Sequence, residues 1–85
     1  MQKFTYEIRD PVGLHARPAG LLVKEARKYC SKITVSANGK STEATRLMAL
    51  MGMCIKHGTI VTVEIEGADE ENCAAEMQAF FAQNL

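Results

Sequence analysis

The stretch KITVSANGKSTE, residues 32–43, decides the fold. Apolar and polar side chains alternate through KITVSA, and this period of two predicts a strand with one buried face. Asn38-Gly39 comes next and favours a two-residue hairpin turn, because both residues accept a positive φ. KSTE is then the short return strand, so the chain is expected to build an antiparallel sheet around this hairpin. The side chains expected to face the core are Ile33, Val35 and Ala37.

Outward from the hairpin, further stretches predict the remaining elements. Two of them alternate like strands, KFTYEI at residues 3–8 and TIVTVEIEG at residues 59–67. RPAGLLVKEARKY, residues 17–29, has the apolar spacing of an amphipathic helix, and the Met-rich segment at about 46–53 predicts a short one. A last helix opens at Asp69, which is expected to be its N-cap. The buried stripe expected on that helix is Cys73, Met77, Phe80 and Phe81.

The element order is therefore β-α-β-β-α-β-α. This order predicts an α+β fold, a two-layer open-faced sandwich in which a four-stranded antiparallel sheet carries three helices on one face. Residues 1–85 are expected to form a single domain. Gly20 interrupts the first helix at a cost of up to about 1 kcal/mol relative to alanine. That cost predicts a close approach by another backbone at Gly20.

Charge and hydropathy narrow the class of protein. The formal net charge is zero, which disfavours a nucleic-acid binder, since binding to phosphate backbones needs a clear positive excess. The charge is uneven, because residues 1–46 carry nine basic and four acidic side chains and residues 47–85 carry one and six. No apolar run approaches the roughly 18 residues that span a bilayer. The charged N-terminal stretch is unlike a signal peptide, so no membrane insertion and a cytoplasmic location are expected.

The spacing of the cysteines and histidines predicts no metal site. Cys30, Cys54 and Cys73 are widely spaced and form no CxxC or Cys/His ligand set, so no metal is expected. We expect reduced thiols that are buried as small hydrophobic side chains. His57 lies in a His-Gly turn and is assigned no chemistry.

The candidate site is GLHARPAG, residues 13–20. The first N–H groups of a helix lack intrahelical partners and lie at the positive end of its dipole, so this junction suits an anion. Arg17 adds planar donors that match phosphate oxygens, and Pro18 is tolerated in a first helical turn. An imidazole placed here, that of His15, can act as a nucleophile toward phosphorus. The residues alone also allow an ordinary exposed histidine in the loop before a helix.

The Met-rich segment suggests a second functional surface. It carries more apolar side chains than so short a helix can bury on one face, so some are expected to form an exposed patch for a partner. Gap-filling methionines in the core are the alternative. These apolar side chains are Leu47, Met48, Leu50, Met51 and Met53.

GLHARPA at residues 13–19, the NGKS hairpin at residues 38–41 and the acidic start of the last helix resemble the HPr family. Members are the histidine-containing phosphocarriers of the bacterial phosphoenolpyruvate-dependent sugar phosphotransferase system. The likeness covers essentially the whole chain. It implies a monomeric carrier that is a substrate of its partner enzymes, is not itself an enzyme and needs no cofactor of its own.

The resemblance also implies roles for single residues. His15 would accept a phosphoryl group on Nδ1 from phosphorylated enzyme I and donate it to the IIA domains of sugar permeases. Arg17 would help to hold that group, and backbone amides after His15 would cap it. Ala16 and Pro18 belong to the helix start at this point. The implied docking surface joins two helices and contains Gly20, Leu21, Lys24, Arg27, Leu47, Met48 and Met51.

Three positions depart from the family pattern. Arg46 stands where many members carry a serine that a regulatory kinase phosphorylates, which implies that this regulation is absent. Val12 replaces a polar residue near the histidine, and Cys54 stands where glycine is common. These departures suggest an HPr-like paralogue with a specialised role. A docking or regulatory module of the same fold that carries no phosphate, and a small nucleic-acid-binding domain, are the alternatives.

Overall fold

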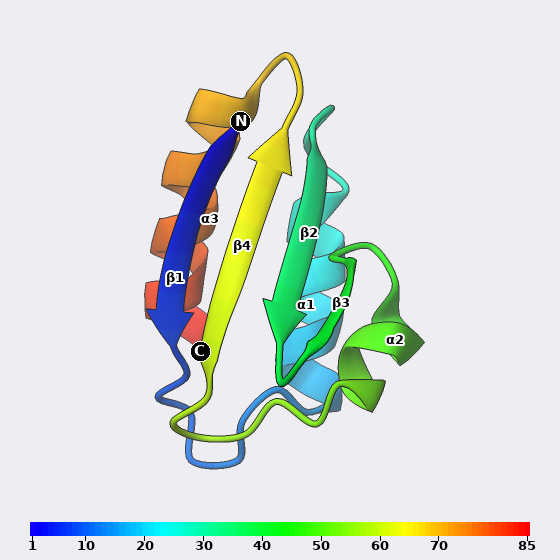
Figure 1. The fold of residues 1–85 in the computed structure, drawn as a ribbon, viewed down its shortest axis with the longest axis vertical. Helices are drawn as coiled ribbons and strands as arrows, with labels where there is room; N and C mark the ends of the chain where they lie inside the picture. Colours follow the sequence, from blue (N-terminus) through cyan, green and yellow to red (C-terminus); the bar gives the residue numbers. More distant parts are fainter.

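Four strands form one antiparallel sheet with the spatial order β1-β4-β2-β3 in the computed structural model, which describes residues 1–85 (Figure 1). The predicted hairpin is confirmed, because Asn38 and Gly39 have φ values of 54° and 76° and Ala37 pairs with Lys40. The last strand in the chain lies between the first and second and pairs with both. The strands are β1 (Gln2–Glu7), β2 (Lys32–Ala37), β3 (Lys40–Glu43) and β4 (Ile60–Glu66).

Three helices complete the predicted β-α-β-β-α-β-α order, α1 (Ala16–Ala26), α2 (Leu47–Gly52) and α3 (Glu70–Asn84). Figure 1 shows α1 and α3 side by side behind the sheet, and α2 packs against β3 and α1. The α+β open-faced sandwich is therefore confirmed. Arg46, expected at the start of the second helix, is its N-cap.

The core lies between the sheet and the helices. Phe4 of β1 pairs with Val63 of β4, which pairs with Val35 of β2, so one apolar row crosses three strands. The Phe81 ring of α3 stands edge-on to Phe4, with ring centroids 5.8 Å apart. The predicted helix faces are largely confirmed, with Phe80 half-buried rather than buried. The buried helical side chains are Pro18, Ala19, Leu22, Val23 and Ala26 of α1, and Cys73, Ala74, Met77 and Phe81 of α3.

Asp69 occupies the predicted N-cap position of α3, but its carboxylate makes no capping hydrogen bond. It accepts hydrogen bonds from the Ser31 hydroxyl and, at 3.0 Å, from the Cys30 N–H. These two bonds, that from Ser31 first, hold the pKa of Asp69 below its usual value. The carboxylate therefore ties the start of α3 to the chain just before β2, where Gly67 leaves no room for a Cβ beside Ser31.

Two further expectations are wrong. A Cβ added at Gly20 would meet nothing within 4 Å, so no other backbone approaches that glycine. Cys30 and Cys54 are exposed, because both lie in loops outside the packed helix faces, and only Cys73 is buried. Burial raises the pKa of the Cys73 thiol to about 11, which makes this cysteine an unreactive core side chain.

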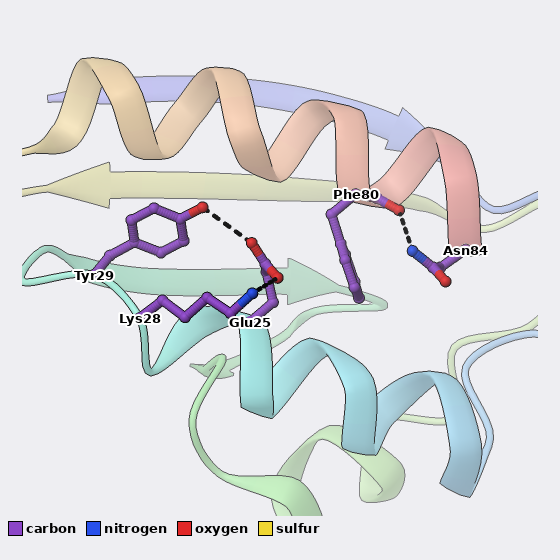
Figure 2. A network of polar contacts seen from close by, with 5 residues as sticks. All are labelled: Glu25, Lys28, Tyr29, Phe80 and Asn84. Atoms are coloured by element: carbon purple, nitrogen blue, oxygen red, sulfur yellow. Dashed lines mark hydrogen bonds and ion pairs between the residues drawn. The ribbon is translucent and has the colours of Figure 1, made fainter.

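A polar network lies on α1 and on the residues that follow it (Figure 2). Glu25 accepts a hydrogen bond from Lys28 Nζ and another from the Tyr29 hydroxyl, each at 3.0 Å. The Lys28 bond is the largest cause of a lowered pKa at Glu25. Burial, followed by the bond to Glu25, raises the pKa of Tyr29. These contacts stabilise the C-terminal end of α1, at the opposite end of the helix from His15.

Candidate functional site

Backbone hydrogen bonds fix the loop between β1 and α1 at both ends. The Asp10 N–H donates to the Leu85 oxygen at 2.8 Å, and the Gly13 N–H donates to the Asp10 carbonyl at 3.0 Å. The Leu14 N–H donates to the Ile55 carbonyl at 2.9 Å, and the Leu14 side chain is buried. The residue after Leu14 therefore starts α1 from an anchored position.

His15 is that residue, and it is the N-cap of α1 with φ −99° and ψ −172°. Its side chain makes no capping hydrogen bond, so the imidazole is free for other contacts. The first intrahelical bond runs from the Ala19 N–H to the His15 carbonyl at 3.0 Å. The N–H groups of Ala16 and Arg17 precede that bond and have no acceptor in the helix, while Pro18 has no N–H. Two free backbone donors thus lie beside the imidazole.

A pocket of about 220 Å³ opens at this end of α1. His15 is half-buried at its wall, and Arg17 is exposed with no ion-pair partner in the chain. The structure therefore brings together the imidazole, the guanidinium and the free N–H groups that the motif predicted. The pocket is lined by Asp10, His15, Arg17, Pro18, Leu21, Gln83 and Asn84.

The last turn of α3 supplies a part of this pocket that the sequence did not predict. Asn84 Nδ2 donates to the Phe80 carbonyl at 3.0 Å, which holds the amide along the helix (Figure 2). Gln83 lies beside it on the same wall. Nothing local in the sequence marks these two residues, because the sheet order alone brings the end of the chain to the first loop.

The predicted exposed apolar side chains lie on α1 and α2, which contact each other. Met48 is 78% exposed and Leu21 is 41% exposed, whereas Leu50 is fully buried. The expectation that the second helix keeps apolar side chains in solvent is therefore confirmed. The other residues predicted for docking are Gly20, which is half-exposed, and Lys24, Arg27, Leu47 and Met51, which are exposed.

Cys54 lies directly beyond the α2 C-cap residue Met53 and has φ +56°. Glycine favours this left-handed position after a helix because it has no Cβ, and most other residues are strained there. The structure thus gives a physical reason for the glycine that the family pattern favours at Cys54.

Replacing Cys54 with glycine is expected to stabilise the protein by about 1 kcal/mol, since it removes the strain of a left-handed residue. The exposed thiol contributes only a long contact of 3.8 Å from Sγ to the Gly52 carbonyl. Urea unfolding under reducing conditions measures the effect, with Cys30→Gly as a control at an exposed cysteine without positive φ. An unchanged or lower stability for Cys54→Gly would contradict the prediction.

The sequence also predicts that the chain holds no metal ion and inserts in no membrane. No group of three or more His, Cys, Asp or Glu side chains comes together in a way that could hold a metal ion. None of the helices has the length and apolar character needed to cross a membrane. The residues predicted from the motif lie at the pocket beside His15.

Comparison with known proteins gives a consistent assignment. Residues 2–83 match the family described as the HPr component phosphorylation site of the phosphotransferase system. The chain is 48% identical over 71 residues to the phosphocarrier protein HPr of Mycoplasma capricolum subsp. capricolum, which covers 84% of this chain and 80% of that protein.

Solved structures agree with the sequence match. HPr-C-His from Thermoanaerobacter tengcongensis superposes with a TM-score of 0.92 at 34% identity, over 99% of this chain and 94% of that one. Crh of Bacillus subtilis, described as an intertwined dimer with a swapped domain, superposes with a TM-score of 0.76 at 33% identity. That match covers 100% of this chain and 98% of the Crh chain.

Proposed function

The chain belongs to the HPr family of the phosphotransferase system, and we propose that it carries its phosphoryl group on His15. One observation carries the proposal most directly. The half-buried imidazole, the unpaired Arg17 guanidinium and two free backbone N–H groups meet at the start of α1. Members of this family are phosphocarriers rather than enzymes, so the chain acts as a substrate of its partners.

The proposed transfer step uses Nδ1 of His15, the ring nitrogen that the family resemblance implies. The lone pair of Nδ1 of His15 attacks phosphorus on phosphorylated enzyme I, and the new N–P bond forms as the bond from phosphorus to the donor breaks. The electron pair of the broken bond stays on the donor. The phosphoryl oxygens then accept hydrogen bonds from the Ala16 and Arg17 N–H groups and from the Arg17 guanidinium. The reverse sequence of bond changes delivers the group to a IIA domain.

These contacts are suited to a group that must leave again. A helix N-terminus stabilises an exposed anion by about 0.3–1 kcal/mol, which is modest beside the free energy of a covalent bond. Arg17 is exposed, so solvent screens its attraction for the phosphoryl group. Val12, 67% exposed, adds no side-chain donor beside the site. The phosphoryl group is therefore held loosely enough for transfer.

The partner surface proposed for enzyme I and the IIA domains is the exposed face of α1 and α2. Its centre is apolar, and its basic side chains have no ion-pair partner within the chain. An apolar centre with a basic rim favours partners whose own surfaces carry acidic residues, since complementary charge speeds encounter. The surface consists of Gly20, Leu21, Lys24, Arg27, Leu47, Met48 and Met51.

Arg46 distinguishes this chain within the proposal. It occupies the N-cap of α2, is exposed and provides no side-chain cap. No seryl phosphorylation can occur at residue 46, so the carrier escapes that regulation. Incubation with the regulatory kinase and ATP, followed by mass spectrometry, should find no phosphate at or next to Arg46. Phosphate on Thr45, Ser41 or Thr42 would contradict this part of the proposal.

The central test uses the unmodified protein. Incubated with phosphoenolpyruvate, Mg²⁺ and enzyme I, it should gain one phosphoryl group that mass spectrometry maps to His15. The label should be acid-labile and stable in base, as a phosphoramidate is, whereas a serine ester survives acid. Absence of the label, or its location at His57, would refute the proposed carrier. A docking module that carries no phosphate, the alternative function, would give no label at all.

The carrier is proposed to act as a cytoplasmic monomer of one domain. Crh is described as an intertwined dimer, so the oligomeric state of this chain needs its own measurement. Sedimentation equilibrium across a range of concentrations should give the monomer mass of 9.3 kDa. A stable mass of twice that value would replace the monomer by a dimer.

Gly20→Ala is expected to separate folding from docking. It should stabilise the protein by roughly 0.5–1 kcal/mol, because alanine favours a helix and the added Cβ meets open space. If partners pack closely on Gly20, the same methyl group should weaken binding to enzyme I several-fold. Urea unfolding and calorimetric titration measure the two effects, with the exposed Gln78→Ala on α3 as control. Unchanged affinity for enzyme I would remove Gly20 from the docking surface.

A further inference from the structure

Asp10 lies in the same pocket as His15, although the motif does not include it. Three hydrogen bonds fix it. Its N–H donates to the Leu85 oxygen at 2.8 Å, its carbonyl accepts from the Gly13 N–H at 3.0 Å, and its Oδ1 accepts from the Val12 N–H at 2.9 Å. Asp10 is half-buried as a residue, and its carboxylate takes part in the turn through the bond from the Val12 N–H. The carboxylate therefore cannot swing away from the pocket without losing its hydrogen bond from the Val12 N–H.

The charge of this carboxylate is not neutralised by a cation of the chain. The ion pairs of the structure join the N-terminus to Glu70 and Lys28 to Glu25, so neither Arg9 nor Arg17 pairs with Asp10. No hydrogen bond in the chain uses Oδ2 of Asp10. The pocket consequently contains one cation, Arg17, and one anion, Asp10, that face the same small volume. An anion in this pocket weakens the retention of a phosphoryl group, because like charges repel.

We propose that Asp10 sets how readily the carrier gives up its phosphoryl group. The inference rests on the proposed phosphorylation of His15. A phosphoryl group adds between one and two negative charges near neutral pH, and a carboxylate fixed in the same pocket repels them. The repulsion acts on the phosphorylated state alone, because the unmodified imidazole has no such charge. Asp10 therefore offsets part of the attraction of Arg17 and raises the tendency of the group to transfer.

The bond changes show where the repulsion is relieved. In transfer, phosphorus forms a bond to the acceptor while its bond to the His15 ring nitrogen breaks, and the electron pair returns to that nitrogen. In hydrolysis the acceptor is the oxygen of water, inorganic phosphate leaves, and a proton from water goes to the imidazole. Both reactions move the negatively charged phosphoryl group away from the Asp10 carboxylate. Both should therefore respond in the same direction when the carboxylate loses its charge.

Asp10→Asn is the decisive variant, because an amide oxygen can keep the hydrogen bond from the Val12 N–H while the charge is removed. The equilibrium constant for phosphoryl transfer from enzyme I should be roughly three- to tenfold larger for the variant than for the chain with Asp10. The isolated phosphoprotein should hydrolyse more slowly, as followed by phosphorus NMR. Both differences should shrink as salt is added, since salt screens charges. Glu64→Gln, which makes the same charge change on the polar face of the sheet, should leave both quantities unchanged.

The outcomes separate this inference from the function on which it rests. If the unmodified chain gains no phosphate on His15, the proposed function fails and the inference fails with it. If that phosphorylation is normal but Asp10→Asn behaves like Glu64→Gln, the role of Asp10 alone is overturned. Asp10→Ala removes both the charge and the turn bond. A shift of the equilibrium in Asp10→Ala without one in Asp10→Asn would show that the turn matters and the charge does not, which also overturns the inference.

Discussion

Replacing His15 with alanine is expected to abolish phosphoryl transfer while the fold persists. The imidazole supplies the only nucleophilic nitrogen in the pocket, whose other polar side chains are a carboxylate, a guanidinium and two amides. No remaining group there can form the N–P bond that a phosphocarrier needs. Incorporation of acid-labile phosphate from phosphoenolpyruvate through enzyme I should therefore fall to background.

Stability should change little in the same variant. The His15 side chain makes no capping hydrogen bond, so alanine removes no contact that holds the start of α1. We expect the free energy of unfolding to stay within about 1 kcal/mol of its original value. His57→Ala, at the other histidine of the chain, is the matched control because that residue is exposed in a turn. Transfer activity that survives in His15→Ala and disappears in His57→Ala would reverse the assignment of the site.

The sequence predicts the fold well because the elements carry local signals. The alternating strands, the Asn38-Gly39 turn and the apolar faces of α1 and α3 all appear where their periodicity places them. One contact that the sequence does not predict joins residues that lie far apart along the chain. Asp69 is of a residue type that favours a helix cap, yet its carboxylate accepts hydrogen bonds from Cys30 and Ser31 in the loop before β2, an alternative that no local pattern shows.

The candidate site divides in the same way. His15 and Arg17 can be predicted because one short motif contains them together with the helix start. The sequence around Asp10 indicates only the end of a strand. No sequence pattern indicates a function for Asn84. Both lie in the pocket because β1 and α3 end at the same edge of the sandwich, as Figure 1 shows. Tertiary placement, rather than residue type, brings these two residues beside His15.

Gly13→Ala is expected to lower the free energy of unfolding by roughly 2–4 kcal/mol, for two separate reasons. Gly13 has φ +84°, a left-handed conformation that costs a residue with a Cβ about 1–2 kcal/mol. The added Cβ would also lie 2.5 Å from the Ile55 carbonyl oxygen and 2.6 Å from the Lys56 Cα. These are backbone atoms, so neither can move aside as a flexible side chain would.

The contact also connects stability to function, because the Ile55 carbonyl accepts the hydrogen bond from the Leu14 N–H that anchors the chain before His15. Phosphoryl transfer should therefore slow at temperatures where Gly13→Ala is still folded. Gly58→Ala is a close control, since Gly58 has φ +86° and a Cβ there would meet nothing within 4 Å. It should show the cost of the left-handed conformation alone and leave transfer unchanged. Equal losses of stability in the two variants, measured by urea unfolding, would mean that the loop yields around Gly13 and that its close packing does not position His15.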